Sequence, residues 1–177
     1  LWSGVQALNQ QARSAYDHAA ATFGGARTAM LVSRTNATFP QKLFVDLRRA
    51  GWPVSPVLEG RIQISGRSFR LLGIEPVTLP SEVGNTPAIG KANLQAFVTP
   101  PGEMLAAPET LSELNLAEGA TPPSNGGAAL PPLRAQPNLV PGVLVVDIGI
   151  AQRLLKMPDQ VSRLLVGKAR SPRAPLD

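Results

Sequence analysis

The sequence feature that most constrains the fold is an alternating stretch within residues 51–80. Between residues 54 and 64, small or apolar residues alternate with polar ones: Leu58, Gly60, Ile62 and Ile64 against Ser55, Glu59, Arg61 and Gln63. A period of two is typical of a strand with one face in a core and the other in water. Ser65 and Gly66 separate this run from a second one, which predicts a hairpin. Because an isolated hairpin is marginal in water, other parts of the chain must cover it.

Length and composition limit the number of domains, the regularity of the connections and the kinds of site and partner. A chain of 177 residues suits one domain, or two small subdomains that share a core. The 18 prolines and 16 glycines predict long irregular connections. The absence of cysteine excludes disulfides, thiolate metal sites and thiol catalysis, and it leaves the redox compartment open. A net charge of +5 with only 16% charged residues is too sparse for a dedicated polyanion binder.

Residues 1–23 predict one long amphipathic helix that ends at Gly24 and Gly25. Apolar residues recur there at spacings of three and four: Leu1, Val5, Leu8, Ala12, Ala15, Ala19 and Phe23. A helix of this length is a rod of roughly 34 Å. It either packs on the core or continues a membrane helix that precedes it. With no initial methionine, no apolar run of about 20 residues and no signal-peptide pattern, the sequence is expected to be a piece of a longer protein.

A strand, a helix and a strand are predicted between residues 28 and 58. Residues 28–32 are an apolar run typical of a buried strand. Thr38 is the expected N-cap of a helix that has Pro40 in its first turn. The inner face of this helix is expected to carry four residues before Gly51 ends it: Leu43, Phe44, Leu47 and Ala50. A crossover of this kind is expected to be right-handed.

A second unit of the same kind is predicted near the end of the sequence. Residues 143–146 and 164–166 are apolar runs typical of strands, and residues 148–155 between them predict a short helix before Pro158. The two units share an order of elements without sequence identity.

Residues 80–142 differ in composition from the rest of the sequence, because most of the prolines lie there. Proline cannot donate a ladder hydrogen bond, so any strands in this region must be short or at a sheet edge. Residues 94–98 are the best candidate strand, residues 108–116 predict one or two helical turns, and residues 122–127 predict an exposed turn.

No motif in the sequence predicts catalysis, cofactor binding or a metal site. The stretch GNTPAIGKA has the wrong glycine spacing for a phosphate loop and places Ala92 where a hydroxyl is needed. His18 is the sole histidine, so neither a serine triad nor a zinc site is supported. Four glutamates that cluster in sequence fit solvated faces rather than a glycosidase pair: Glu103, Glu109, Glu113 and Glu118. We therefore assign no catalytic, cofactor-binding or metal-binding residue, and we expect no cofactor.

Five arginines gather around the alternating stretch, where they are candidates to face acidic lipid head groups or a protein partner: Arg48, Arg49, Arg61, Arg67 and Arg70. Apart from Trp52 and Phe69, no aromatic residues are interleaved with them. Single-stranded nucleic acid is bound by such interleaved aromatic residues, so nucleic acid is not expected as a partner.

Four blocks of the sequence, in order, resemble a known family. They are LWSGVQALNQQARSAYDHAAATFGG, LRRAGWPVSPVLEG, FRLLGIEPVTLP and VLVVDIGIAQRLLKMPDQVSRLL. The first resembles the segment that follows the first membrane helix in FtsX-like, MacB-like ABC transporter permeases of the branch with extra membrane helices. The other three resemble the ectodomain of that branch. The proline-rich middle departs most from the family blocks.

The resemblance implies an α+β fold with a stalk helix, a strand-helix-strand porter subdomain and a β-rich sabre subdomain. On this mapping residues 1–25 are the stalk, residues 26–60 with 143–177 are porter-like, and residues 61–142 are sabre-like. It also implies a non-enzymatic domain on the periplasmic side of a bacterial inner membrane. Its full-length permease would be anchored by flanking membrane helices and work with a separate cytoplasmic ATP-binding subunit.

The same branch is similar to permeases associated with a periplasmic lipase-like or thioesterase-like hydrolase, and its substrates are expected to be lipid-like or otherwise amphiphilic. The leading hypothesis is a domain that moves with the membrane helices when ATP is hydrolysed. The alternative is a non-moving adaptor or ligand-binding module that recruits the hydrolase. A third hypothesis, a hydrolase in its own right, predicts ester turnover by the purified domain, which we do not expect.

Overall fold

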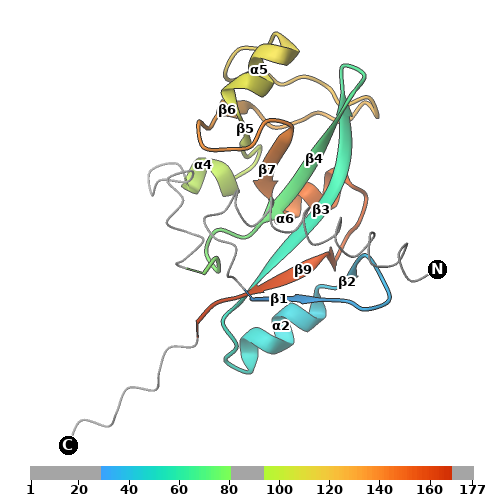
Figure 1. The fold of residues 1–177 in the computed structure, drawn as a ribbon, viewed down its shortest axis with the longest axis vertical. Helices are drawn as coiled ribbons and strands as arrows, with labels where there is room; N and C mark the ends of the chain where they lie inside the picture. Colours follow the sequence, from blue (N-terminus) through green and yellow to red (C-terminus); the bar gives the residue numbers. More distant parts are fainter. Residues whose placement is uncertain (1–28, 81–93, 169–177) are drawn as a thin grey trace, which may run out of the picture.

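The computed structural model describes residues 29–80 and 94–168, which form an α+β fold built on one mixed sheet (Figure 1). The described part holds a seven-stranded sheet in the order β1-β9-β3-β4-β7-β5-β6. Only the β4–β7 and β5–β6 pairs are parallel. The strands are β1 (Ala29–Val32), β9 (Arg163–Val166), β3 (Val54–Ile64), β4 (Arg67–Ile74), β7 (Val143–Asp147), β5 (Met104–Ala106) and β6 (Leu133–Ala135). The predicted α+β class is confirmed, whereas the predicted stalk helix, His18 and the GNTPAIGKA stretch lie outside the described residues.

The predicted hairpin is confirmed and forms the centre of the sheet. β3 pairs with β4 up to Ile64 opposite Arg67, which leaves Ser65 and Gly66 as a two-residue turn. Both turn residues have positive φ angles, 52° and 77°, as a type I′ turn requires. The even positions of β3 point into the core, as the alternation predicts: Leu58 and Ile64 are fully buried.

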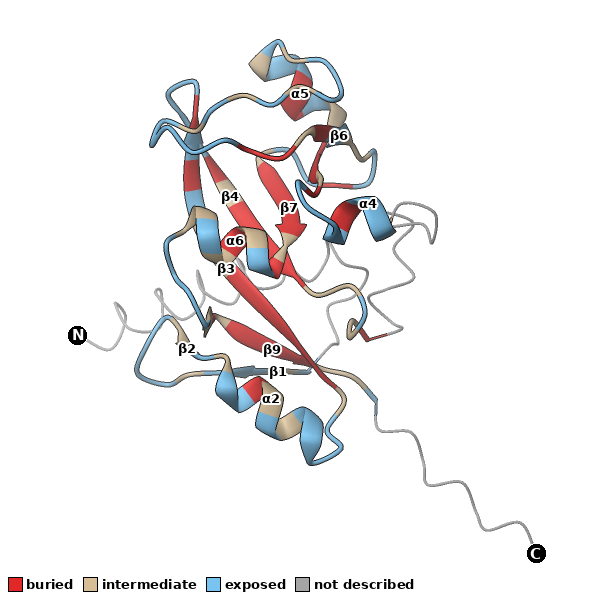
Figure 2. Cartoon of the chain, turned by 180° about the vertical axis from the view of Figure 1, so that it is seen from behind, coloured by how far each residue is buried: buried red, intermediate tan, exposed pale blue. Residues whose placement is uncertain are grey.

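The first half of β3 is buried on both faces, which the alternation did not predict. Ser55 was expected in water and is fully buried. The reason is a second apolar layer on that face, formed around Val57, Leu72 and Phe97. Figure 2 shows the consequence, with buried residues concentrated in the central strands.

Pro56 lies inside β3 without costing a ladder hydrogen bond. The carbonyl oxygen of Val57 accepts from the backbone N–H of Ser162 at 2.8 Å, so the backbone groups of Val57 face β9. Backbone groups alternate in direction along a strand, so Pro56 faces the β4 side. There the β4 ladder ends at Ile74, opposite Val57. The missing N–H of Pro56 therefore falls beyond the end of the ladder.

The two faces of the sheet carry separate cores. The first, called here the α6 face, is covered by α2 (Lys42–Arg49), α5 (Pro108–Leu114) and α6 (Ile148–Leu154), and its core includes Phe44, Leu58 and Ala151. The second, called here the α4 face, is covered by α4 (Leu94–Val98), whose Phe97 packs on Val145. Three charged residues of β3 and β4 lie on the α4 face, namely Glu59, Arg61 and Arg70, while Arg67 lies on the α6 face opposite Ile64.

The second predicted unit is confirmed as β7, α6 and β9. Asp147 is the N-cap of α6, and its carboxylate accepts from the backbone N–H of Gly149 at 3.0 Å. α6 lies close to the sheet because Gly60 of β3 and Gly73 of β4 have no side chains beneath it. A Cβ on Gly60 would stand 2.6 Å from the Leu155 side chain.

The first unit differs from its prediction at the start of the helix and in its buried face. Phe39–Pro40 is β2, which pairs with β8 (Gln160–Val161) in a separate two-stranded sheet, so α2 begins only after Gln41 and Thr38 is not its cap. Phe44 is the buried residue of α2, while Leu43 is 46% exposed and Ala50 is exposed. The helix is capped near Ala50 and Gly51 follows with φ of 90°, so Gly51 does end it as predicted.

β1 is a strand, as predicted, but it is not buried: Leu31 is 43% exposed and Val32 is 50% exposed. The reason is that β1 lies at the edge of the sheet, beside β9. β1 and β3 are both antiparallel to β9, which lies between them, so the two strands of this unit point the same way without being neighbours.

The proline-rich region also differs in part. Residues 94–98 were predicted as a strand and form helix α4, with Phe97 as its buried residue. The helix predicted at 108–116 is confirmed as α5, which ends at Asn115 with φ of 53°. β5 and β6 were not predicted, because each has only three residues among prolines.

Candidate functional site

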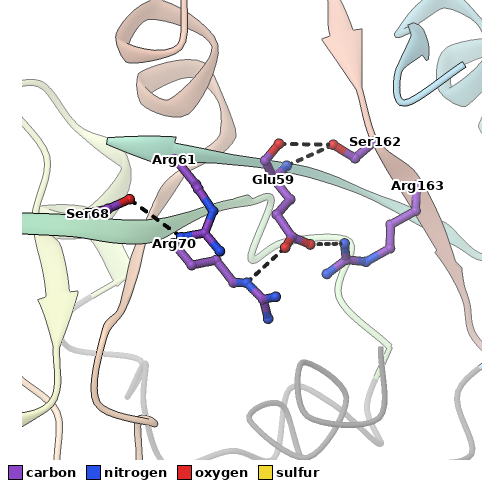
Figure 3. Close-up of polar contacts among 6 residues, drawn as sticks. All are labelled: Glu59, Arg61, Ser68, Arg70, Ser162 and Arg163. Carbon is purple, nitrogen blue, oxygen red and sulfur yellow. Dashed lines mark hydrogen bonds and ion pairs between the residues drawn. The ribbon is translucent and has the colours of Figure 1, made fainter. Parts of the chain in front are cut away.

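A charged cluster centred on Glu59 spans three strands of the α4 face (Figure 3). One carboxylate oxygen of Glu59 lies 3.0 Å from Nε of Arg70 on β4, and the other lies 2.6 Å from Nη1 of Arg163 on β9. The side chain of Arg163 is only 5% exposed and that of Glu59 is 27% exposed. Glu59 therefore uses both carboxylate oxygens to connect the strands on either side of β3, with one charge of the cluster buried.

Ser162 extends this cluster to the backbone. The backbone N–H of Glu59 donates to Oγ of Ser162 at 2.8 Å, while the N–H of Ser162 donates to the Val57 carbonyl. Ser162 lies just before β9, where Arg163 is already paired with Val57. Two successive residues thus oppose Val57, which is the pattern of a β-bulge. The bulge sets the start of β9 and directs Arg163 toward Glu59.

The structure divides the five arginines of the predicted basic group among three places. Arg61 and Arg70 lie on the α4 face, where Arg61 Nη1 donates to Oγ of Ser68 at 3.5 Å. Arg67 is paired with Glu113 of α5 at 3.5 Å. Arg48 and Arg49 are in the last turn of α2, where positive charge stabilises the helix C-terminus. Sequence reasoning missed Arg163, because only the folded sheet brings it beside Glu59.

The clustered glutamates have structural partners. Glu103 is paired with Arg134 at 3.0 Å and is 13% exposed, so it is less solvated than predicted. Glu118 accepts from the backbone N–H of Ala135 at 2.9 Å. Glu109 lies in the first turn of α5, where a negative charge is favourable.

Two carboxyl groups lie at the carboxyl ends of the parallel strands β4 and β7. Asp147 ends β7 opposite Ile74, and Glu75 follows β4 directly. Burial raises the pKa of Asp147 above its usual value of 3.8, the charge of Glu75 adds to this rise, and the hydrogen bond from Gly149 opposes it. Within residues 29–80 and 94–168, no group of three His, Cys, Asp or Glu residues could hold a metal ion.

Glu75 belongs to a chain of hydrogen-bonded side chains. Oγ1 of Thr78 lies 2.6 Å from the Glu75 carboxylate and 3.0 Å from Oγ of the buried Ser55. A hydroxyl has one hydrogen, so Thr78 donates to the carboxylate and accepts from Ser55. This arrangement satisfies the buried hydroxyl of Ser55.

The two edges of the sheet differ. At the β6 edge, the backbone N–H groups of Leu133 and Ala135 donate to Ala120 and Glu118, and the carbonyl of Leu133 accepts from Gly119. This edge is closed by the chain itself. At the β1 edge, the described residues provide no further strand.

No helix among the described residues is long and apolar enough to span a bilayer. Comparison with models of protein families finds no match, and comparison with characterised proteins finds none either.

Comparison with solved structures finds similarity to several chains, among them two transporter domains. One is the extracellular domain of the noncanonic ABC-type transporter YknZ from Gram-positive bacteria, with 10% identity, a TM-score of 0.49, and coverage of 82% of this chain and 83% of that one. The other is the periplasmic region of MacB from Actinobacillus actinomycetemcomitans, with 13% identity, a TM-score of 0.47, and coverage of 81% and 70%. At these values the similarity assigns neither a family nor a function to this chain.

Proposed function

We propose that this chain is the periplasmic domain of an ABC transporter permease and acts mechanically, coupling ATP hydrolysis by a cytoplasmic subunit to movement of an amphiphilic substrate. The observation that carries the proposal is how the permease-like blocks assemble. The blocks at residues 47–60, 69–80 and 143–165 are far apart in sequence, yet they contribute β7, α6 and most of β3, β4 and β9. The resemblance thus coincides with one continuous part of the sheet rather than with scattered segments.

The path of the chain through the sheet also supports the proposal. Ala29, the first residue of β1, is paired with Val166, the last residue of β9. The chain therefore joins and leaves the described body at the same end (Figure 1). A domain inserted between two membrane helices requires this, because both connections must return to one surface.

The contacts of α6 support a body that moves as a unit. Gly60 and Gly73 let α6 lie directly on the hairpin, and the Glu59 cluster joins β4, β3 and β9. A displacement applied at the β1–β9 end would then be transmitted through packed elements instead of being absorbed by them. In this proposal residues 1–25 are the stalk that delivers the displacement.

Finer parts of the proposal rest on the sequence resemblance alone. These are the lipid-like nature of the substrate, the association with a periplasmic hydrolase, and the division into porter-like (26–60 and 143–177) and sabre-like (61–142) subdomains. The described parts of both subdomains contribute strands to the same sheet, so their boundary would fall within it.

The location is tested by thiol labelling of the full-length protein. Val77 is 78% exposed and the sequence has no cysteine, so Val77→Cys is a clean reporter. We expect a membrane-impermeant maleimide to label this variant in cells whose outer membrane alone has been permeabilised. Labelling that requires lysis of the inner membrane would overturn the proposal.

The mechanical role is tested by breaking the proposed stalk. Ala12→Pro and Ala19→Pro would interrupt a helix over residues 1–23, and the measurement is ATP hydrolysis coupled to transport by the reconstituted transporter. We expect coupling to be lost while the ATP-binding subunit still co-purifies. Normal coupling together with tight retention of a hydrolase would instead support the non-moving adaptor.

A further inference from the structure

The C-terminal end of α2 is followed by a short exposed segment of unusual composition. Five successive residues there are exposed: Arg48, Arg49, Ala50, Gly51 and Trp52. The side chain of Trp52 is 54% exposed. A single exposed apolar side chain is ordinary on a protein surface. Here, however, one short run of the chain presents an indole together with two guanidinium groups. This run is called here the Arg-Trp surface.

The backbone holds the Arg-Trp surface in a fixed shape. The N–H of Gly51 donates to the Arg48 carbonyl at 3.0 Å, and the N–H of Trp52 donates to the Leu47 carbonyl at 3.0 Å. These two bonds, with φ of 90° at Gly51, form the Schellman motif that closes a helix. The carbonyl of Trp52 in turn accepts from the N–H of Val54 at 2.9 Å. Trp52 is therefore an exposed side chain on an ordered backbone.

The two arginines of this surface are not neutralised by neighbouring carboxylates. A positive charge is favourable at the end of a helix, which accounts for the position of Arg48 and Arg49. Among the described residues, however, neither guanidinium has a carboxylate partner. Asp46, the acidic residue closest to them in sequence, is paired with Lys42 at 2.6 Å. The Arg-Trp surface therefore carries two positive charges that can meet an anion from outside the chain.

The Arg-Trp surface lies where the chain leaves the sheet. The carbonyl of Pro53, the residue after Trp52, accepts from the N–H of Gly167 at 2.7 Å, just after β9 ends. Figures 1 and 2 both show the C-terminal end of α2 beside this end of β9. Ala29 lies at the same end, paired with Val166. The next step rests on the proposed function: both connections then run from here to the membrane, so the Arg-Trp surface faces the bilayer.

We propose that the Arg-Trp surface rests on the head groups of anionic phospholipids in the membrane from which the domain projects. An indole has an apolar ring and one N–H donor, and tryptophan is enriched at the depth of the head groups for this reason. A guanidinium on a long apolar stem can bind a lipid phosphate with two hydrogen bonds. The same side chains are also common in protein interfaces. Their position beside both chain connections favours the membrane.

The contact is expected to be weak for the free chain, because only one indole and two arginines contribute to it. The strength of such interfacial binding depends on the apolar area that enters the membrane and on the attraction of basic residues to anionic lipids. Both terms can be measured separately with vesicles of different composition, provided that lipid is in large excess.

The test uses the fluorescence of Trp52 in the purified chain. Trp2 is the other tryptophan of the sequence, so Trp2→Phe makes Trp52 the sole reporter. Vesicles of phosphatidylglycerol or of phosphatidylcholine are prepared with brominated acyl chains, which quench tryptophan on contact. We expect quenching by the phosphatidylglycerol vesicles that weakens at high salt, and little quenching by phosphatidylcholine. Equal quenching by the two lipids would overturn the proposal. Absence of quenching would also overturn it and would leave a protein partner as the occupant of this surface.

Two double variants separate this surface from the net charge of +5. Arg48→Gln with Arg49→Gln should weaken binding to phosphatidylglycerol vesicles about 25-fold, since each basic residue near an anionic surface contributes about five-fold. The matched control is Arg153→Gln with Lys156→Gln, which removes the same charge from exposed positions at the end of α6. The loop after α6 is bound through the Asp159 carbonyl to the opposite end of α2, so this control should retain most of the affinity. An equal loss in both double variants would overturn the proposal.

A measurement without lipid tests whether the surface is accessible. Because Trp52 is 54% exposed, acrylamide should quench its fluorescence in the free chain. Strong protection from acrylamide would overturn the proposal, since another segment of the chain would then cover the surface. These outcomes are independent of the labelling of Val77→Cys, which tests the location of the domain. Failure of the lipid contact is therefore distinguishable from failure of the proposed function.

Discussion

Gly73 of β4 lies so close to Ala151 of α6 that a Cβ atom on Gly73 would overlap the methyl group of Ala151. The Cα of Ile148 would be only 3.1 Å from the same atom. Both neighbours are rigid, since one is a Cβ and the other is helix backbone. The close approach of α6 to the hairpin therefore depends on the absence of a side chain at Gly73.

Gly73→Ala should consequently lower the free energy of unfolding by about 1–3 kcal/mol, the usual range for overpacking a core. Urea denaturation measures this change. Gly60→Ala should cost less, because the atoms it meets are the mobile end of Leu155. The matched control is Gly126→Ala, whose nearest neighbour is Oγ of Ser124 at 3.8 Å, and which should leave stability unchanged. Equal stability of the Gly73 and Gly126 variants would contradict the packing described.

Glu59→Gln should destabilise the protein by about 1–3 kcal/mol, because it removes the charge that faces the buried Arg163 guanidinium. Glu113→Gln is the control, since the Glu113–Arg67 pair is more than half exposed on both sides and spans 3.5 Å. Exposed pairs contribute little, so this control should change stability by less than about 0.5 kcal/mol. Thermal melts of both variants make the comparison, and a similar small effect in each would show that the Glu59 cluster does not hold the strands together.

Ile62→Asp should prevent cooperative folding, because Ile62 is 8% exposed within the core of the α6 face and a carboxylate there has no partner. Gln63→Asp, the next residue and on the exposed face, should retain a normal melting transition. Circular dichroism during heating distinguishes the two. A normal transition for Ile62→Asp would remove Ile62 from the core.

The pKa of Asp147 gives the stability a pH dependence with a defined sign. Burial raises this pKa, so above pH 3.8 the folded state keeps a proton that the unfolded chain has lost. The free energy of unfolding attributable to Asp147 must then fall as pH rises from this value through the raised pKa of the folded state. Asp147→Asn keeps an oxygen that can accept from Gly149 and removes the titration. We expect the variant to gain stability relative to the parent across this interval in urea titrations, and a difference that is constant with pH would count against the assignment.

The parts of the fold that were predicted from sequence are those with a local pattern. The period of two in β3 and the turn at Ser65 and Gly66 identify the hairpin without reference to any partner. The β7-α6-β9 unit was equally clear, because each of its elements is a short apolar run bounded by a break. Each of these sequence patterns can be recognised within about ten residues.

The predictions from sequence were wrong where a residue far away in the sequence determines the burial or pairing of a segment. Ser55 is buried because of an apolar layer that includes Phe97, and Glu59 meets Arg163 across 104 positions of sequence. Residues 94–98 form an apolar run too short for its period to distinguish helix from strand. No local pattern indicates that β1 lies at an edge, because exposure there depends on which strand it pairs with.

The pairing of Ala29, Val166 and Val54 in one row has a geometric consequence for the whole body. β3 runs from this row to the turn at Ser65, a distance of roughly 33 Å at the usual rise per residue. If β3 rotates by only about 5° about this row, the turn at its other end moves sideways by roughly 3 Å. The hairpin tip is thus the point of largest excursion for any rotation imposed where the chain joins the sheet.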